Sequence, residues 1–372
     1  MTKKAILFLS ILLFVLSCND DDTPVICSPS GDLSEIEYNP QDYNFEHGDC
    51  LPTMFIPATN TLTVDGVELG RHLFYDPILS ADSSMACAGC HFPELSFSDG
   101  KKVSKGIDGL EGKRSAMSII NLGYLEKGLF WDGRVNTLEE QALVPVEDPI
   151  ELHDTWMNVE TKLRRHATYP TMFRKAFGIG DTEDITRDLA VRALAQFERS
   201  VVSFNSEYDK VKIKEEAIFS DSAERGFRMF FDHNQNQGQG LLDAECGHCH
   251  SDILFSNGEY FNNGLDAVNS LTDFEDWGRG LVTQDTFDNG KFRVPTLRNI
   301  ALTAPYMHDG RFETLEEVID FYNESPNHTG SNVDVNIRPL NLTEGQKQDL
   351  INFLHTLTDT VFTNNPAYQS PF

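Results

Sequence analysis

Hydrophobic residues recur every three or four positions along several stretches of the chain, and this spacing predicts amphipathic helices. The longest stretch runs over Asp181–Tyr208 and is expected to end a first domain. A capping box at Thr314–Glu317 predicts the start of a later helix whose apolar face includes Tyr322. Another amphipathic helix is expected over Asn341–Thr358. No long alternation of polar and apolar residues occurs, so the sequence predicts an all-α fold.

A different apolar segment, Ala5–Leu16, follows two lysines near the N-terminus. It is shorter than the roughly 20 residues that span a membrane, and it has the length of a signal-peptide core. The segment leads to Cys18 in a context that resembles a bacterial lipobox. Residues 1–18 are therefore predicted to be a lipoprotein signal peptide, with an ordinary secretory signal as the alternative. Residues 19–60 are interpreted as a tether and N-terminal segment. The mature protein is expected in the periplasm or cell envelope, attached to the membrane only through lipid on Cys18.

The charge balance restricts the choice of partners. The 372 residues include 58 acids and 30 bases, which gives a formal net charge of −28. A surface with this surplus repels nucleic acid and attracts a basic protein.

Two motifs of the form Cys-x-x-Cys-His carry the strongest chemical signal. Two thiols at this spacing can bond to the vinyl groups of one haem, and the histidine that follows can ligate the iron. A zinc site built from the two Cys-x-x-Cys pairs is the alternative, but it does not explain the histidine after each pair. The sequence therefore predicts two covalently bound c-type haems. The motif residues are Cys87, Cys90 and His91, then Cys246, Cys249 and His250. The remaining Cys27 and Cys50 could form a disulfide, although nothing in the sequence fixes their separation.

The segment ahead of each haem motif is repeated. Glu68–Asp76 precedes the first motif and the similar Glu224–Asp232 precedes the second. Such self-similarity indicates an internal duplication. We therefore expect two cytochrome c-like haem domains, an N-terminal one over residues 61–212 and a C-terminal one over residues 213–372.

The order of the motifs is similar to that of the bacterial di-haem cytochrome c peroxidase family, which includes MauG. The resemblance covers roughly residues 60–360 and implies that the N-terminal haem reacts with peroxide while the C-terminal haem receives and stores electrons. His91 and His250 would be the two proximal iron ligands. The matching segments are CAGCH, Phe130–Arg134, CGHCH, Phe292–Asn299 and Pro305–Gly310.

The resemblance also assigns the distal side of the first haem. Glu151 matches a glutamate that the family uses as an acid-base group, and Gln141 matches a glutamine of the same pocket. Peroxide cleavage needs such a group because one oxygen loses a proton while the other gains one. Trp131 falls where the family has a tryptophan between the haems, an aromatic relay for electrons or radicals, although a structural turn would give the same motif.

Two positions depart from the classical peroxidases and match MauG. Ile107 stands where a histidine caps the resting peroxidatic iron, so the first iron is expected to be open. Tyr322 stands where a methionine ligates the second iron, and a phenolate in that place would lower the reduction potential. Met307 remains an alternative ligand, and a core tyrosine remains an alternative role for residue 322.

The resemblance further implies a calcium ion between the haems. Thr303 and Pro305 match positions that hold it through backbone carbonyls, whereas the family asparagine falls on Ser115 here.

The sequence is compatible with three functions. The first is a di-haem peroxidase that reduces hydrogen peroxide to water through a ferryl at the N-terminal haem. Its electrons would come from a small, basic cytochrome or blue copper protein. The second is a MauG-like oxidase that uses high-valent haem to oxidise a protein or organic substrate. The third is a non-catalytic di-haem electron carrier, against which Glu151 and the open distal side argue. Family members often form dimers, so a homodimer is compatible with the resemblance.

Overall fold

The computed structural model describes residues 31–45, 51, 53–231, 244–324 and 326–372. The predicted signal peptide with Cys18, the cysteines Cys27 and Cys50 and most of the loop before the second haem motif lie outside these residues. Within the described ranges, no helix combines the length and the apolar character needed to cross a membrane.

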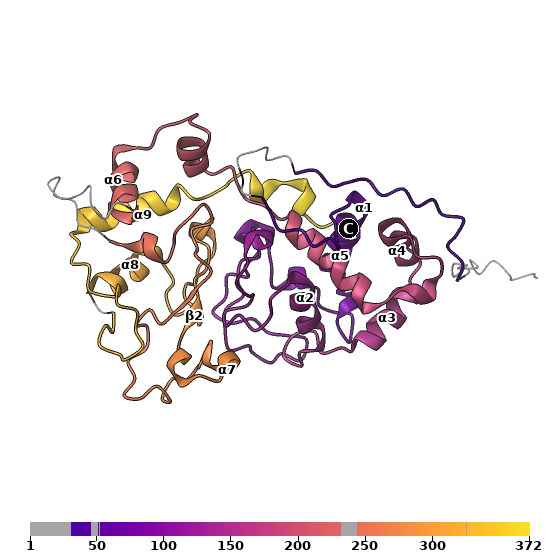
Figure 1. The fold of residues 1–372 in the computed structure, drawn as a ribbon, viewed down its shortest axis with the longest axis horizontal. Helices are drawn as coiled ribbons and strands as arrows, with labels where there is room; N and C mark the ends of the chain where they lie inside the picture. Colours follow the sequence, from indigo (N-terminus) through magenta and orange to yellow (C-terminus); the bar gives the residue numbers. More distant parts are fainter. Residues whose placement is uncertain (1–30, 46–50, 52, 232–243, 325) are drawn as a thin grey trace, which may run out of the picture.

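The described chain is mostly helical and forms two lobes (Figure 1). The first lobe contains α1 (Val64–Tyr75), α2 (Leu138–Glu147), α3 (Trp156–Arg165), α4 (Tyr169–Phe177) and α5 (Arg187–Ser200). The second lobe contains α6 (Asp221–Phe231), α7 (Gly280–Thr283), α8 (Leu315–Glu324) and α9 (Glu344–His355). It also holds a short antiparallel sheet, in which Tyr260 of β1 (Tyr260–Phe261) pairs with Arg293 of β2 (Phe292–Arg293). The prediction of helices is confirmed, and this sheet is the difference from an all-α fold.

Each lobe is built on one closely packed pair of helices. In the first lobe, α1 lies against α5, and a Cβ atom at Gly70 would overlap the backbone carbonyl of Ala193. In the second, α6 lies against α9, and a Cβ atom at Gly226 would overlap the carbonyl of Asp349 in the same way. Only glycine permits this approach of two helix backbones. The two contacts occur at the same sequence separation. The internal duplication and the domain boundary between residues 212 and 213 stay predictions.

The predicted helix over Asp181–Tyr208 is too long at both ends. Helix α5 begins at Arg187 and ends at Ser200, after which the chain is not helical up to Asn205. There the side chain of Asn121 accepts a hydrogen bond from the backbone N–H of Ser203 (3.0 Å) and donates one to the Ser203 carbonyl (3.2 Å). These bonds replace the helical ones, so the apolar spacing alone could not locate the helix end. The helices predicted from Thr314 and over Asn341–Thr358 are confirmed as α8 and α9.

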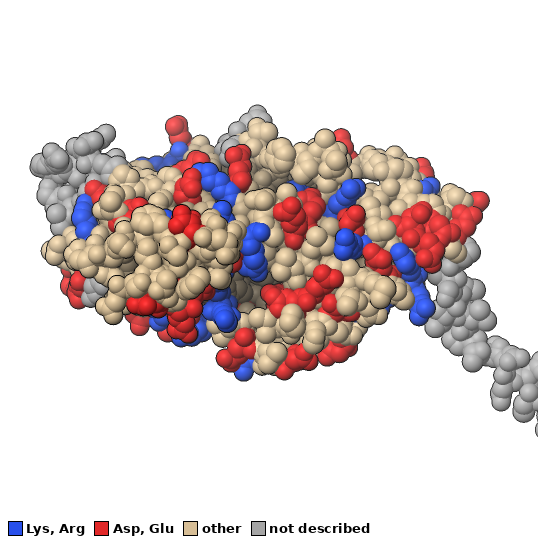
Figure 2. Space-filling view, turned by 60° about the horizontal axis from the view of Figure 1, so that its bottom comes forward, with Lys and Arg blue, Asp and Glu red and all other residues tan. Residues whose placement is uncertain are grey.

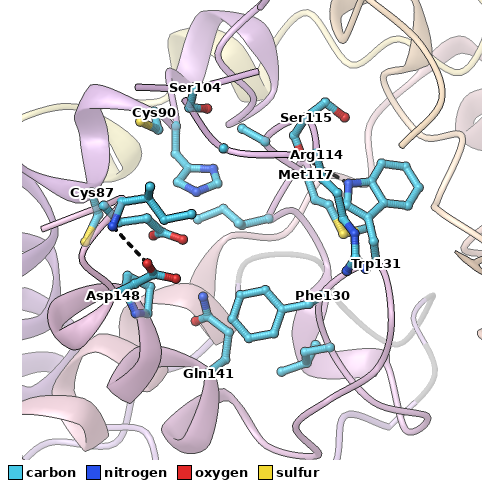
Figure 3. A pocket seen from close by; sticks show the side chains of 18 of the residues that line it. Cys87, Cys90, Ser104, Arg114, Ser115, Met117, Phe130, Trp131, Gln141 and Asp148 are labelled. Atoms are coloured by element: carbon cyan, nitrogen blue, oxygen red, sulfur yellow. Dashed lines mark hydrogen bonds between the residues drawn. The ribbon is translucent and has the colours of Figure 1, made fainter. Parts of the chain in front are cut away.

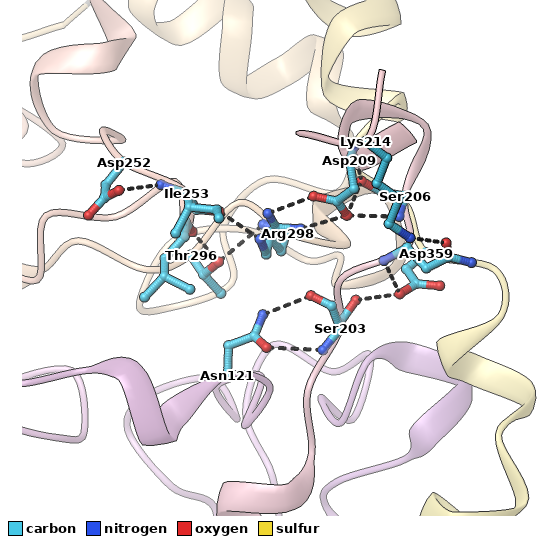
Figure 4. Close-up of polar contacts among 12 residues, drawn as sticks. Asn121, Ser203, Ser206, Asp209, Lys214, Asp252, Ile253, Thr296, Arg298 and Asp359 are labelled. Atoms are coloured by element: carbon cyan, nitrogen blue, oxygen red, sulfur yellow. Dashed lines mark hydrogen bonds and ion pairs between the residues drawn. The ribbon is translucent and has the colours of Figure 1, made fainter. Parts of the chain in front are cut away.

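A buried polar cluster joins the two lobes (Figure 4). The guanidinium of Arg298 donates to both carboxylate oxygens of Asp209 at 3.0 and 2.9 Å and lies over the ring of Phe204. Asp359 accepts a hydrogen bond from the Ser203 hydroxyl at 3.1 Å. Beyond this cluster the C-terminal segment returns to the first lobe, where Tyr368 is part of the apolar core. The sequence analysis did not anticipate this return.

Candidate active site

A cavity of about 670 Å³ opens in the first lobe around the first haem motif (Figure 3). Its wall includes Cys87, Cys90 and His91, together with Gln141 from α2 and Glu151 from the loop that follows. The structure therefore places the predicted attachment residues and the two predicted distal residues around one space.

His91 is held in one orientation by the backbone. Its Nδ1 atom lies 2.7 Å from the carbonyl oxygen of Phe97, which makes Nδ1 the donor and leaves Nε2 as the nitrogen available for a metal. Burial lowers the pKa of His91, so the ring is neutral and can act as a ligand. Burial also raises the pKa of the Cys87 and Cys90 thiols.

The cavity also contains polar atoms without protein partners. Gln141 Oε1 and Glu198 Oε2 are buried, and neither has a hydrogen-bond partner among the described residues. Buried polar atoms nearly always have such partners. An apolar space with a neutral histidine, two thiols at haem-attachment spacing and unsatisfied polar atoms fits a covalently bound haem. His91 would then ligate its iron.

Glu151 lies on a loop that its neighbours fix. Asp148 Oδ1 accepts a hydrogen bond from Ile150 N at 2.9 Å, and the Glu151 carbonyl accepts one from Ile107 N at 3.0 Å. Burial, assisted by the charge of Asp148, raises the pKa of Glu151 to about 7, while Arg134 opposes the shift. A carboxyl with a pKa near neutrality can both accept and donate a proton.

The segment that carries Ile107 packs against this loop. A Cβ atom at Gly106 would overlap the carbonyl oxygens of Ile150 and Glu151, so the two backbones are in direct contact. Gly106 lines the cavity, whereas Ile107 does not. Of the described residues that line the cavity, His91 is the one histidine.

Trp131 lies between the large cavity and a smaller one of about 80 Å³, and it contributes to both walls. Its Nε1 atom donates to the carbonyl of Ser115 at 3.0 Å, which fixes the indole (Figure 3). On the side of the second lobe, its ring lies 6.5 Å from the ring of His308. This position agrees with that of a relay between two redox centres, which stays a prediction.

The second haem motif has a similar histidine. His250 Nδ1 lies 3.0 Å from the carbonyl of Phe255, and burial lowers the pKa of His250 to about 4. Burial raises the pKa of the Tyr322 phenol, the hydrogen bond from Asn263 opposes the shift, and the charges of Cys246 and Cys249 add to it. These residues fit a second haem with His250 as a ligand.

Asn263 lies between the two candidate ligands for the other side of that haem. Its amide donates to the Tyr322 hydroxyl at 2.9 Å and lies 3.6 Å from the Met307 sulfur. Sequence reasoning missed Asn263, since a single asparagine without a motif carries no signal. It missed Glu198 for the same reason, and it named Arg134 only as part of the Phe130–Arg134 motif, without a role in the cavity.

The residues proposed for calcium line the smaller cavity. Thr303, Pro305 and Ser115 all contribute to its wall. The Ser115 hydroxyl, however, donates to the Met307 carbonyl at 3.1 Å. The calcium ion therefore stays a prediction.

Comparison with known proteins agrees with this arrangement. The profile of the di-haem cytochrome c peroxidase family matches residues 64–217. The cytochrome-c peroxidase IdrP1 of Pseudomonas sp. (strain SCT) is 33% identical over 335 residues, which cover 83% of this chain and 84% of that protein. The methylamine utilization protein MauG of Methylophilus methylotrophus is 32% identical over 320 residues, or 86% of this chain and 89% of MauG.

A solved structure shares the fold over almost its whole length. The crystal structure of a MauG-like protein associated with microbial copper homeostasis superposes with a TM-score of 0.81 and 32% identity, covering 88% of this chain and 99% of that one. Identity above 30% over more than four fifths of both chains, together with the two Cys-x-x-Cys-His motifs, identifies the relationship. The chain belongs to the di-haem cytochrome c peroxidase family, whose members carry two c-type haems.

Proposed function

We propose that this protein reduces hydrogen peroxide to water at the cavity of the first lobe, with electrons from a small redox protein that arrive through the second haem site. The observation that carries the proposal is Glu151, a carboxyl with a pKa of about 7 on the wall of the cavity that holds His91. An electron carrier has no use for an acid-base group in that place.

Each residue around the cavity has a different role in the proposed reaction. When bound, the first haem supplies an iron that accepts oxidising equivalents from peroxide. Glu151 takes the proton from one peroxide oxygen and delivers it to the other, which departs as water. Gln141 carries an unpartnered Oε1 that can accept a hydrogen bond from peroxide or water in the cavity. Arg134 lies over the ring of Phe130 and places a positive charge near Glu151.

Electron supply is assigned to the second lobe. Trp131 would pass electrons between the two sites, because it contributes to both cavities and its ring lies near His308. Tyr322 is the proposed sixth ligand of the second haem, with Met307 as the alternative. Thr303 and Pro305 would hold the calcium ion between the sites through their carbonyl groups.

The electron donor is proposed to be basic. The chain has a net charge of −28, and acidic side chains are spread over the face shown in Figure 2, with Lys and Arg between them. Complementary charge accelerates the encounter of two such proteins, especially at low salt. We further propose that the protein is attached to the membrane through lipid on Cys18, in the periplasm or cell envelope. It is also proposed to form a homodimer.

A MauG-like oxidase is the second candidate, and one observation favours it. No histidine other than His91 lines the described wall of the cavity, and Ile107 stands in the position of the capping histidine. The first iron would then react while fully oxidised, without the priming electron that classical peroxidases need. Relatives named MauG support the same possibility of substrate oxidation.

A stopped-flow experiment tests the first proposal. The oxidised protein is mixed with one equivalent of hydrogen peroxide, and the haem absorbance is followed for wild type, Glu151→Gln and Glu147→Gln. Glu147 is exposed and lies outside the cavity, so the loss of its carboxylate should not affect the reaction with peroxide. We expect Glu151→Gln to slow the reaction roughly 10²-fold or more and Glu147→Gln to leave it unchanged. Equal rates for all three proteins would remove Glu151 from the mechanism.

The same mixtures separate the two candidate functions. Peroxide consumption that accelerates when a reduced small cytochrome is added supports the peroxidase. Slow consumption that the cytochrome does not accelerate, with oxidation of an added protein substrate, supports the oxidase.

A further inference from the structure

Glu198 is an acid on the cavity wall that the proposed peroxide chemistry does not use. Its side chain is buried, with 6% exposed, and it follows Leu194 by four residues on α5, so both side chains reach the cavity from one helix face. The Oε2 atom is buried and has no hydrogen-bond partner among the described residues. The carboxyl is therefore positioned to respond to what the cavity holds.

No ion pair to Glu198 occurs among the described residues. The charged residues that line the same cavity are Lys105, Lys113, Arg114, Asp132, Arg134, Asp148, Glu151, Glu275, Asp276 and Arg293. Arg199, the next residue on α5, is held by Glu139 of α2 through two hydrogen bonds of 2.7 and 2.8 Å. Helix α1 and the turn at Leu122–Tyr124 present the apolar Phe74 and Leu122 to the cavity. The charged side chains of α3 and α4 are exposed or make contacts away from the cavity: Glu160, Lys162, Arg164, Arg165, Arg174 and Lys175.

The charge of Glu198 also acts on a haem attachment residue. Burial, followed by the charge of Glu198, raises the pKa of the Cys87 thiol. For Glu198 itself, burial raises the pKa to about 8, with Arg199 opposing the shift and Glu139 adding to it. The carboxyl therefore changes its protonation state at mildly alkaline pH.

The charge of the haem site differs by one unit between its oxidation states. An oxidised haem carries one more positive charge than a reduced one, and a nearby positive charge favours the ionised form of a carboxyl. In a buried space of low dielectric constant this interaction is strong. Reduction removes the positive charge and so favours the protonated carboxyl.

We propose that Glu198 is a redox-linked proton site, whose carboxylate takes up one proton from solvent when the first haem iron gains one electron and releases it when the iron is oxidised again. The inference shares one assumption with the proposed function, namely that a haem occupies this cavity. The electron comes from the small redox donor, and in the test from a chemical reductant. Proton uptake keeps the net charge of the cavity constant during electron transfer, which makes the first haem easier to reduce at low pH.

The test is a spectroscopic redox titration of the haem-loaded protein between pH 6 and 9, without peroxide. For wild type we expect the midpoint potential of the first haem to fall as pH rises, toward the limit of about 59 mV for each tenfold change in proton activity in a one-electron step. In Glu198→Gln, which keeps the size of the side chain, this slope should flatten. The second haem in the same sample serves as an internal reference, and the Glu198 variant should not change its potential.

Two further variants make the assignment specific. Glu147→Gln removes an exposed carboxylate from the end of α2 and should keep the wild-type slope. Glu151→Gln removes a second acid of the cavity wall, the one proposed for the peroxide chemistry. The proposal is overturned if the wild-type potential does not depend on pH, or if Glu198→Gln keeps the full slope. It is also overturned if the slope disappears in Glu151→Gln alone. The redox titration contains no peroxide, so it is independent of the stopped-flow test of the proposed function. A potential that does not change with pH, together with a fast peroxide reaction in the stopped-flow test, would refute this inference and leave the proposed function intact.

Discussion

The buried ion pair between Arg298 and Asp209 gives a stability prediction with a defined size. The side chains are 1% and 0% exposed, and the two hydrogen bonds measure 3.0 and 2.9 Å. Replacement of Asp209 by Asn keeps the shape but leaves the guanidinium without its counter-charge. Breaking one side of such a pair costs about 3–5 kcal/mol, because the remaining charge stays buried.

Urea unfolding of the haem-loaded protein, followed by circular dichroism, measures this loss as a shift of the midpoint at constant slope. The exposed pair Lys105–Glu111 is the control, since both side chains are more than half exposed. Glu111→Gln should therefore cost less than about 1 kcal/mol. A double variant with Asp209→Asn and Arg298→Met should recover most of the loss, because it removes both charges. If Asp209→Asn costs no more than Glu111→Gln, the pair does not stabilise the junction of the lobes and the reasoning fails.

Three other predictions concern the two sites. The rate of the peroxide reaction should rise with pH through about 7, because Glu151 accepts a proton only when ionised above its pKa, and Glu151→Gln should lose this step in a stopped-flow pH profile. Tyr322→Phe should change the ferric absorption spectrum of the second haem while Met307→Leu leaves it unchanged; the opposite pattern would assign the ligand to Met307. Gly106→Ala should slow the peroxide reaction at least tenfold, because the added methyl overlaps the carbonyl of Ile150 and displaces the loop, and a normal stopped-flow rate would show that the loop position is unimportant.

The sequence predicted those features that depend on local patterns. Helix α9 follows from its apolar spacing, and the structure adds a capping box at Thr343. The haem motifs follow from the spacing of the two thiols and the histidine directly after them. The resemblance brought Glu151 and Gln141 to the cavity, although they lie on different segments. The prediction of α9 succeeded because it depends on a few neighbouring residues, whereas the roles of Glu151 and Gln141 stay predictions.

Long-range contacts could not be read in this way. The return of Tyr368 to the first core has no pattern in the sequence, since a single aromatic residue fits many packing sites. The end of α5 depends on Asn121, which lies far away in the chain and satisfies the backbone of Ser203. Glu198 belongs to an ordinary amphipathic helix, and only the folded chain shows that its carboxyl lines the cavity without a partner.

The choice between peroxidase and oxidase depends on the second site more than on the first. The residues proposed to handle peroxide, Glu151 and Gln141, would serve both activities equally, because each activity begins with the same cleavage. The two activities differ in what reduces the oxidised haem site. In a peroxidase, electrons from the donor protein reduce it, whereas in an oxidase the electrons are taken from a substrate. A phenolate ligand from Tyr322 would stabilise ferric iron and slow the storage of electrons, whereas a Met307 thioether would favour it. Asn263 contacts both side chains, so on the proposed function the position of this one amide would influence both the choice of ligand in the second lobe and the fate of peroxide in the first.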